Sequence, residues 1–244
     1  MIATTSAAPT RSSSYQKYDD YFKKYTERYF GDRADWRLFK AQAIVESGLR
    51  PTVVSPVGAR GIMQIMPATY GDIRKHNPDN LHDIDDPESN IAGGIWYAHQ
   101  EWTYWERNSD SKDHDQFMFG SYNAGRGPLK RAQKLAASAK MNEKSWPTIE
   151  KVAPQVSNWR YRETLAYVIA VYANLDSIGR GGEVKGETIS KDDGDASTLP
   201  DRLKGFLTKF KPRWKPDWSN EILGGLMKGV NGVKKINPTQ RKRD

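Results

Sequence analysis

Residues 41–48 read AQAIVESG, an apolar run that ends in an acid, a serine and a glycine. Just before it, Trp36, Phe39 and Ala43 recur at spacings of three and four, which is the period of one face of an α-helix. Glu46 is three residues further on and falls on that same face. The pattern predicts a helix that ends near Glu46 and turns this acid toward the protein interior.

The expected position of Glu46 suggests a chemical role. Burial disfavours a charged carboxylate, and the last turn of a helix adds the negative end of the helix dipole. Both effects favour the neutral acid, and a glutamic acid that stays protonated near neutral pH can act as a general acid. The same local sequence also fits a frayed helix end with a solvated carboxylate, so the choice depends on the rest of the chain.

Three later segments bear on that choice. They are GIMQ at residues 61–64, SYNAG at 121–125 and ETLAYV at 163–168. Together with the Glu-Ser pair at 46–47, and in this order, they resemble the catalytic domain of the soluble-type lytic transglycosylases, relatives of goose-type lysozyme. The resemblance covers roughly residues 30–178, with Ser121 in place of the family's usual alanine. It implies a mainly α fold of the lysozyme-like α+β type with a small β-hairpin.

The resemblance also implies an activity, cleavage of the β-1,4 bond between N-acetylmuramic acid and N-acetylglucosamine in peptidoglycan. In that family one glutamate protonates the glycosidic oxygen, and the substrate's acetamido oxygen stabilises the positive centre. The glutamate then deprotonates the muramyl 6-hydroxyl, which closes a 1,6-anhydro ring. We assign this catalytic role to Glu46. No cofactor is implied, and the four histidines show no metal-ligand spacing, so no metal is assigned.

Seven further residues fall on the family's motifs and are candidates for binding the glycan strand: Ser47, Met63, Gln64, Tyr122, Asn123, Glu163 and Tyr167. Ser47 can hydrogen-bond the sugar or Glu46, or only cap the helix end. Met63 offers a soft apolar wall, and Gln64 can hydrogen-bond an acetamido group, although both also fit a buried segment.

The other four candidates lie in the later motifs. The resemblance places the Tyr122 hydroxyl near the acetamido group, where Asn123 can fix it, bind sugar or end the helix. Glu163 is one helical turn from Tyr167, and we expect it to be structural rather than catalytic. For Tyr167 a packing role and a functional role are equally consistent with the sequence.

Composition divides the chain into four segments. Residues 1–14 are rich in Ser, Thr, Ala and Pro and are predicted to be disordered. Residues 15–179 carry the motifs and form the predicted catalytic domain. Residues 180–200 are rich in Gly, Asp, Lys and Ser, which is typical of a flexible linker, and residues 201–244 form a basic amphipathic tail with two predicted helices.

Within the predicted catalytic domain, periodicity and capping residues locate the helices. They are expected over 15–30, from a cap at Asp35 to Glu46, over 67–74, from a cap at Asp86 to Trp105, over 113–122, over 128–139, and up to Gly179 through Leu165, Val168, Tyr172 and Leu175. Residues 51–60 are expected to form an irregular loop or a short hairpin.

The composition also limits the setting of the protein. There is no cysteine among the 244 residues, which excludes disulfides, thiolate catalysis and Cys-ligated zinc. No apolar run approaches the roughly 18 residues of a transmembrane helix. The first ten residues do not have the pattern of a signal peptide. We expect either that an export signal has been removed or that the protein reaches the cell wall by another route, such as a phage virion that carries its own wall-degrading enzyme.

The net charge of +8 is concentrated at one end of the chain. Residues 199–244 contain 12 of the 38 basic and 4 of the 30 acidic residues, and the remaining 26 of each kind cancel. A basic segment suggests an acidic partner, for which nucleic acid, an anionic membrane or other virion proteins are candidates, or it is simply a solvated tail. The sequence does not indicate an oligomeric state.

Two alternatives to a lytic transglycosylase fit the same motifs. The first is a hydrolytic muramidase on the same fold, which would use a water molecule and an aspartate. The second is a structural protein of a virion or a secretion channel that carries a lysozyme-like passenger domain. Product analysis separates the first from the transglycosylase, and any cleavage of peptidoglycan excludes the second.

Overall fold

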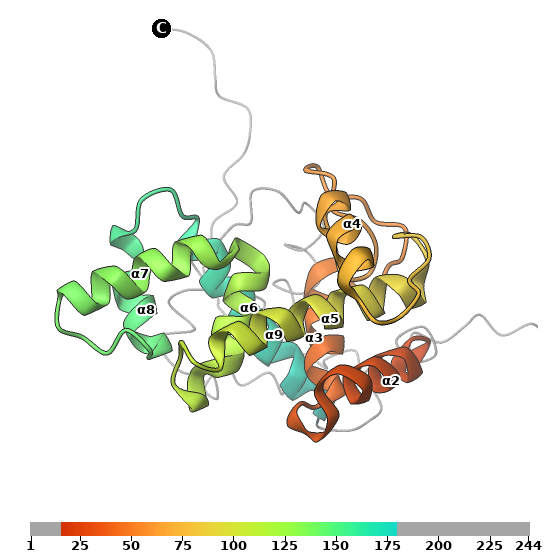
Figure 1. Ribbon diagram of the computed structural model, residues 1–244, viewed down its shortest axis with the longest axis horizontal. Coiled ribbons are helices and arrows are strands. Elements are labelled where there is room, and N and C mark those ends of the chain that lie inside the picture. The colour runs from red at the N-terminus through yellow and green to blue at the C-terminus, as the bar shows by residue number, and fades with distance from the viewer. Residues whose placement is uncertain (1–15, 180–244) are drawn as a thin grey trace, which may run out of the picture. The chain divides into compact units, whose positions relative to one another are not determined.

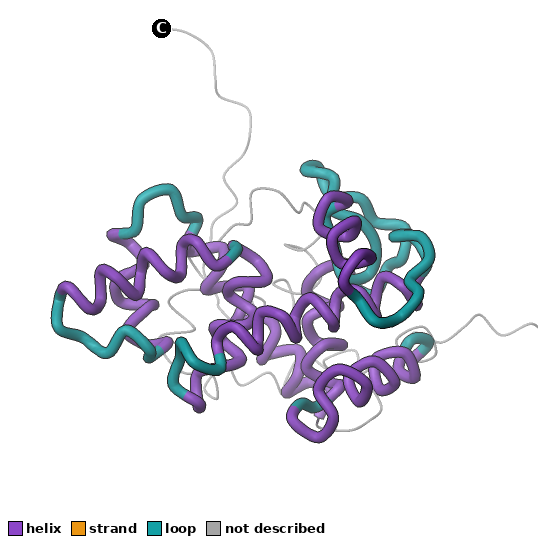
Figure 2. The backbone as a smooth tube through the Cα atoms, in the orientation of Figure 1, coloured by secondary structure: helices purple, strands orange, loops and turns teal. Residues whose placement is uncertain are grey.

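The computed structural model describes residues 16–179, and its regular structure there is helical throughout (Figures 1 and 2). The α-helices are α2 (Asp19–Phe30), α3 (Trp36–Ser47), α4 (Pro67–His76), α5 (Pro87–Trp105), α6 (His114–Ala124), α7 (Arg126–Ser138), α8 (Trp146–Val152) and α9 (Tyr161–Gly179). Three short 3-10 helices join them, at Gly31–Arg33, Ser111–Asp113 and Ala153–Gln155. The mainly α fold expected from the sequence is confirmed.

The core forms where α3 packs against α9 and where α5 packs against α2 and α6. Figure 1 shows α5 running across the domain, with α4 at one end and α7 and α8 at the other. Large side chains that are less than 2% exposed fill the space between these helices; they include Phe22, Phe30, Phe39, Ile91, Ile95, Trp105, Phe117 and Phe119. Burial of such side chains is the main source of stability in a domain of this size.

Capping residues set the ends of the helices that carry the site. Asp35 accepts a hydrogen bond from the backbone N–H of Arg37 at 2.9 Å and so begins α3. Gly48, with φ 65°, ends the same helix in the left-handed conformation that glycine adopts without strain. Asp86 caps α5 by accepting from the N–H of Ser89 at 2.8 Å. These three features agree with the sequence prediction.

The structure corrects the prediction of a β-hairpin. Between α3 and α4 there are two isolated antiparallel bridges, Val54 with Arg60 and Arg60 with Ile65, and no strand forms anywhere in residues 16–179. The chain reverses direction at Gly58 (φ 90°) and again at Gly61 (φ 78°), so no run of paired residues is long enough to build a ladder.

Two helix predictions were incomplete. Helix α7 begins at Arg126 rather than at Pro128, because a proline is tolerated anywhere in the first helical turn, where its missing N–H has no intrahelical partner to lose. Helix α8 was not predicted. With only seven residues it is too short to show a clear helical period in the sequence.

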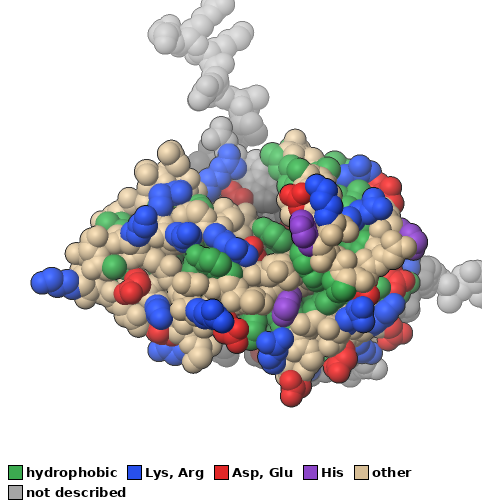
Figure 3. Space-filling view, in the orientation of Figure 1, with side chains coloured by type: hydrophobic (Ala, Val, Ile, Leu, Met, Phe, Trp, Pro, Cys, Tyr) green, Lys and Arg blue, Asp and Glu red, His purple; other side chains and the backbone are tan. Residues whose placement is uncertain are grey.

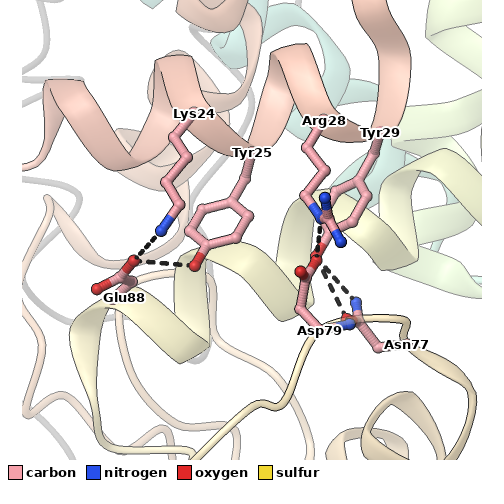
Figure 4. A network of polar contacts seen from close by, with 7 residues as sticks. All are labelled: Lys24, Tyr25, Arg28, Tyr29, Asn77, Asp79 and Glu88. Carbon is pink, nitrogen blue, oxygen red and sulfur yellow. Dashed lines mark hydrogen bonds and ion pairs between the residues drawn. The ribbon is translucent and has the colours of Figure 1, made fainter.

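Helix α2 is joined to the rest of the domain by a group of polar contacts that we call the α2 network (Figure 4). Its members are Lys24, Tyr25, Arg28, Tyr29, Asn77, Asp79 and Glu88. Glu88 accepts from Lys24 at 2.7 Å and from the Tyr25 hydroxyl at 2.9 Å. Asp79 accepts from Arg28 and from the Tyr29 hydroxyl, both at 2.6 Å. The network fastens α2 to the segment before α5 and to the first turn of α5.

The predictions for residues 1–14, for the linker 180–200 and for the tail 201–244 lie outside the described residues. Within the described residues, acidic and basic side chains are interspersed over the face that Figure 3 presents. The cancelling charges of the predicted catalytic domain suggested this pattern. None of the helices over 16–179 combines the length and the apolar character needed to cross a bilayer.

Candidate active site

Glu46 lies one residue before the end of α3, at the position that the sequence predicted. Its side chain faces the interior, and the residue is 7% exposed. Burial extends over ten consecutive residues of α3, from Leu38 to Ser47, because the helix passes between α2 and α9. The alternative of a frayed helix end with a solvated carboxylate is therefore wrong.

One oxygen of Glu46 is held by α9. The hydroxyl of Tyr167 donates to Glu46 Oε1 at 2.7 Å, which is a short hydrogen bond. Removal from water, and then the negative charge of Glu46, raise the pKa of Tyr167 well above its ordinary value. Tyr167 consequently keeps its proton near neutral pH and can donate it to Glu46 in a hydrogen bond.

The segment Arg60–Ile65, which we call the 60–65 loop, lies between α3 and α6. Ser47 Oγ donates to the carbonyl of Ile62 at 2.8 Å, and the Tyr122 hydroxyl donates to the carbonyl of Met63 at 3.0 Å. The pKa of Tyr122 is also raised well above its ordinary value, first by removal from water and then by the charge of Glu46. Tyr122 therefore lies within electrostatic reach of the catalytic candidate.

Two features fix the shape of the 60–65 loop. The side chain of Asn90, on α5, donates to the carbonyls of Arg60 and Ile84 at 3.1 and 2.7 Å and accepts from the N–H of Met63 at 2.8 Å. Met63 also packs on Gly94 so closely that a Cβ there would lie 2.6 Å from its side chain. The contacts with Asn90 and Gly94 of α5 thus position the motif residues of the 60–65 loop.

The predicted binding residues take different positions. Met63 is fully buried, and Gln64 uses its amide nitrogen to hold the carbonyls of Val53 and Gly61 at 3.0 and 2.9 Å. Asn123 is partly exposed at the end of α6, beside Tyr122. Glu163 lies in the first turn of α9 and faces Arg160 at 3.8 Å. Their roles in binding sugar stay predictions.

Three residues near Glu46 were given no role from the sequence. Gln42 donates to the hydroxyl oxygen of Tyr167 at 3.1 Å, Asn90 anchors the 60–65 loop, and the ring of Tyr97 meets that of Tyr122 edge to face at 5.2 Å. A signal existed for Gln42, since it is a polar residue in an apolar helix and precedes Glu46 by one turn. The contacts of Asn90 and Tyr97 join segments far apart in the chain.

The contacts of Glu46 favour acid–base chemistry. Among residues 16–179 no group of three or more His, Cys, Asp or Glu side chains could hold a metal ion. Glu46 instead has a neutral hydroxyl donor at one oxygen, next to a loop and a tyrosine that are both held in place. These features define a helical domain with a buried glutamate beside a neutral hydroxyl donor, an arrangement that can protonate a leaving group.

Sequence comparison identifies the family. The Transglycosylase SLT domain family matches residues 20–145, which include Glu46, the 60–65 loop and Tyr122. The chain belongs to this family, as the order of its motifs predicted.

Individual relatives are similar over most of the described chain. The membrane-bound lytic murein transglycosylase F of Pseudomonas fluorescens is 29% identical over 182 residues, which are 75% of this chain and 34% of the relative. The protein of the same name from Serratia proteamaculans is 31% identical over 170 residues, 68% of this chain and 31% of the relative. The chain thus spans about a third of the length of the curated relatives it matches.

Solved structures show the same fold. The 70 kDa soluble lytic transglycosylase of Escherichia coli matches with a TM-score of 0.52 and 29% identity, over 67% of this chain and 24% of that one. A complex of the 70-kDa soluble lytic transglycosylase with bulgecin A matches with a TM-score of 0.52 and 30% identity, over 68% of this chain and 25% of that one. The lysozyme-like helical fold is confirmed.

Proposed function

We propose that this chain is a peptidoglycan lytic transglycosylase that cleaves the β-1,4 bond between N-acetylmuramic acid and N-acetylglucosamine and leaves 1,6-anhydro-muramyl ends. The observation that carries the proposal is the buried position of Glu46, with its Oε1 held by the Tyr167 hydroxyl at 2.7 Å. The names of the relatives, lytic murein transglycosylases, support peptidoglycan as the substrate.

In this mechanism Glu46 acts twice. As an acid it gives its proton to the glycosidic oxygen, and the sugar leaves as an alcohol. The acetamido oxygen of the substrate stabilises the positive centre. As a base, Glu46 then takes the proton of the muramyl 6-hydroxyl, whose oxygen bonds to the anomeric carbon. The attacking hydroxyl belongs to the same sugar, so its effective concentration is high and no water needs to be activated.

The contacts of other acids favour this mechanism over hydrolysis with a second carboxylate. The aspartates nearest to the GIMQ motif in the sequence each have a hydrogen-bond or ion-pair partner within the protein. Asp72 pairs with Lys75 at 3.2 Å, and Asp83 accepts from the N–H of Asp85 at 2.9 Å. Asp85 in turn accepts from Arg60 at 2.9 Å, while Asp86 caps α5. A glycosidase with two carboxylates needs both on the scissile bond.

The proposed substrate contacts follow the motifs. We assign Tyr122 to the acetamido group of the substrate and Asn123 to a sugar hydroxyl, because both lie at the end of α6 beside the 60–65 loop. Ser47, Met63 and Gln64 shape that loop, and we assign them to the glycan strand from their positions in the motifs. Tyr167 holds Glu46, and Glu163 supports the start of α9.

The setting of the reaction is a separate part of the proposal. We infer delivery to the bacterial wall by a phage particle, with the basic residues 199–244 as the segment that attaches to nucleic acid, an anionic membrane or another virion protein. The argument is the +8 charge of that segment beside a neutral catalytic region. Binding through the segment should weaken steeply with salt, and its loss should leave cleavage of short soluble glycans intact.

One experiment tests the activity: mass spectrometry of the muropeptides released from purified sacculi by the wild type and by Glu46→Gln. The wild type should release anhydro-muramyl ends and the variant none. Reducing ends in their place would identify a hydrolytic muramidase. Absence of any product from the folded wild type would favour a structural protein that carries an inactive lysozyme-like domain.

A further inference from the structure

The side chain of Gln42 also contacts the Tyr167 hydroxyl that binds Glu46. Gln42 precedes Glu46 by one turn of α3 and is completely buried, with 0% of the residue exposed. Its Nε2 donates to the Tyr167 hydroxyl oxygen at 3.1 Å, and that hydroxyl donates to Glu46 Oε1 at 2.7 Å. The three groups form a chain of hydrogen bonds that links two turns of one helix through a tyrosine of another.

The amide of Gln42 has no second contact that would explain its presence. Its Oε1 is buried and finds no hydrogen-bond partner in the described part of the chain. A buried amide with an unsatisfied oxygen destabilises a folded protein relative to an apolar side chain of the same size. The contact with Tyr167 is therefore the specific interaction that the residue provides.

This contact determines the direction of the Tyr167 proton. A phenolic hydroxyl has one proton to donate, and its oxygen accepts hydrogen bonds. Because Gln42 occupies the oxygen as a donor, the single proton of Tyr167 is directed to Glu46 Oε1. An oxygen that accepts this hydrogen bond is a poor site for a proton of its own, so the proton of neutral Glu46 is confined to Oε2.

We propose that Gln42 is a positioning residue that acts through Tyr167 and keeps the exchangeable proton of Glu46 on Oε2. The inference rests on the proposed function, in which Glu46 first gives a proton to the glycosidic oxygen and later takes one from the 6-hydroxyl. With Gln42 in place, both transfers use the same oxygen, and the glutamic acid returns to its starting state after each turnover. Without it, the Tyr167 hydroxyl can turn and accept a hydrogen bond from a proton on Oε1, where the substrate cannot use that proton.

The first test replaces Gln42 with methionine, which keeps the length of the side chain and removes the donor. Turnover of soluble, uncross-linked glycan strands should fall roughly 10- to 100-fold, less than the about 10²–10⁴-fold of a lost general acid. KM should stay within about twofold, because Gln42 is buried and does not reach the substrate. Gln116→Met is the matched control, since Gln116 on α6 also has a buried amide oxygen without a partner, and its kcat should not change.

The second test asks whether Gln42 acts through Tyr167. Tyr167→Phe removes the hydroxyl, so Gln42→Met should cause no additional loss of kcat in that background. Two residues with independent structural roles would instead give losses that multiply. Thermal unfolding of all four proteins in this cycle accompanies the kinetics, and each should retain a cooperative transition.

The outcomes separate this inference from the proposed function. If the folded wild type releases no muropeptides, the proposed function fails and the inference fails with it. If the wild type is active and Glu46→Gln is not, the inference alone is overturned by a Gln42→Met variant with wild-type kcat, or by losses that multiply with Tyr167→Phe. It is also overturned if Gln42→Met does not fold, because Gln42 would then be a packing residue.

Discussion

Two regions of the molecule contain the same contact, a tyrosine hydroxyl that donates to a carboxylate oxygen. In the α2 network, Tyr25 donates to Glu88 and Tyr29 to Asp79, and each carboxylate also binds a basic side chain, Lys24 or Arg28. At the active site, Tyr167 donates to Glu46, and the group behind the tyrosine is the neutral amide of Gln42.

The difference lies in what the surroundings do to the carboxylate. In the α2 network, hydrogen bonds from Lys24 and then Tyr25 lower the pKa of Glu88, so this acid is a permanent anion at neutral pH. Glu46 is 7% exposed on an apolar helix, and the contacts from Gln42 and Tyr167 carry no charge. One contact therefore fastens a helix, and the other holds the acid to which we assign the two proton transfers.

The largest test of this comparison removes the carboxylate at the active site. Glu46→Gln keeps the size of the side chain and an acceptor for Tyr167, so the thermal transition should persist. Cleavage should fall by at least the about 10²–10⁴-fold that a general acid contributes, because the same group serves in both steps. Release of soluble muropeptides from sacculi measures the effect. Digestion at near wild-type rate would show that Glu46 is not the catalytic acid.

Glu88→Gln is the matched change in the α2 network. It removes a carboxylate that also accepts a hydrogen bond from a tyrosine. Glu88 has no role in the proposed reaction, so kcat should be unchanged. A loss of kcat comparable to that of Glu46→Gln would break the comparison, because the α2 network would then contribute to the chemistry.

A smaller effect is expected for Tyr122→Phe. Its hydroxyl holds the carbonyl of Met63 at 3.0 Å and lies close enough to Glu46 for their charges to interact. Turnover should fall roughly tenfold or more with little change in KM, since an oxyanion-hole donor is worth about 10²–10³-fold and this one is shared with the loop.

Tyr70→Phe is the control for Tyr122→Phe. The Tyr70 hydroxyl also bonds to backbone carbonyls of a loop, those of His82 and Asp83 at 3.4 and 3.3 Å, and it has no part in the proposed site. Equal kcat values for Tyr122→Phe and the wild type would reduce Tyr122 to a packing residue.

The two regions also differ in how far the sequence predicted them. The position of Glu46 at the buried end of a helix could be predicted, because helical period and caps depend on residues close together in the sequence and the order of the motifs can be read along the chain. Asp35 and Asp86 begin helices through local hydrogen bonds, and both were predicted correctly as caps. The hairpin was wrong because its formation depends on backbone angles at Gly58 and Gly61 that composition does not fix.

Contacts between distant segments were beyond the sequence. The Gln42–Tyr167 bond joins residues 125 positions apart, and Tyr29 and Asp79 are 50 positions apart. No periodicity relates such pairs, so the sequence predicted the helix over 15–30 but not the α2 network. The same reason hid Asn90, whose importance comes from the loop that it binds in space.

Tyr29→Phe should affect stability and not catalysis. The Tyr29 hydroxyl donates to Asp79 at 2.6 Å and accepts from Asn77 at 3.1 Å, and the residue is 8% exposed. A hydrogen bond to a charged group contributes about 1.5–3 kcal/mol, so the free energy of unfolding should fall by about 1–2 kcal/mol. Denaturant unfolding measures this, with kcat as the control. Unchanged stability would mean that apolar packing alone holds α2.

The smallest effect is a pH dependence confined to the α2 network. Hydrogen bonds from Lys24 and Tyr25 lower the pKa of Glu88. For Asp79, burial acts to raise the pKa, but the hydrogen bonds from Arg28 and Tyr29 have the larger combined effect, so the pKa of Asp79 is also lowered. Carboxyls with a lowered folded pKa stabilise the protein above their ordinary values, about 4.3 for Glu and 3.9 for Asp, and lose that contribution as pH falls through the folded values.

A difference between two proteins isolates this effect, because Asp115 acts in the opposite direction: burial raises its pKa. Lys24→Met removes one cation from Glu88 while leaving Asp115 untouched. At pH 7 the wild type should be more stable by about 0.2–1 kcal/mol, the range for a largely exposed ion pair. As pH falls below about 4, Glu88 becomes protonated in both proteins, and the two unfolding curves should converge. A difference that stays constant down to pH 2 would show that the aliphatic stem of Lys24, and not its charge, stabilises α2.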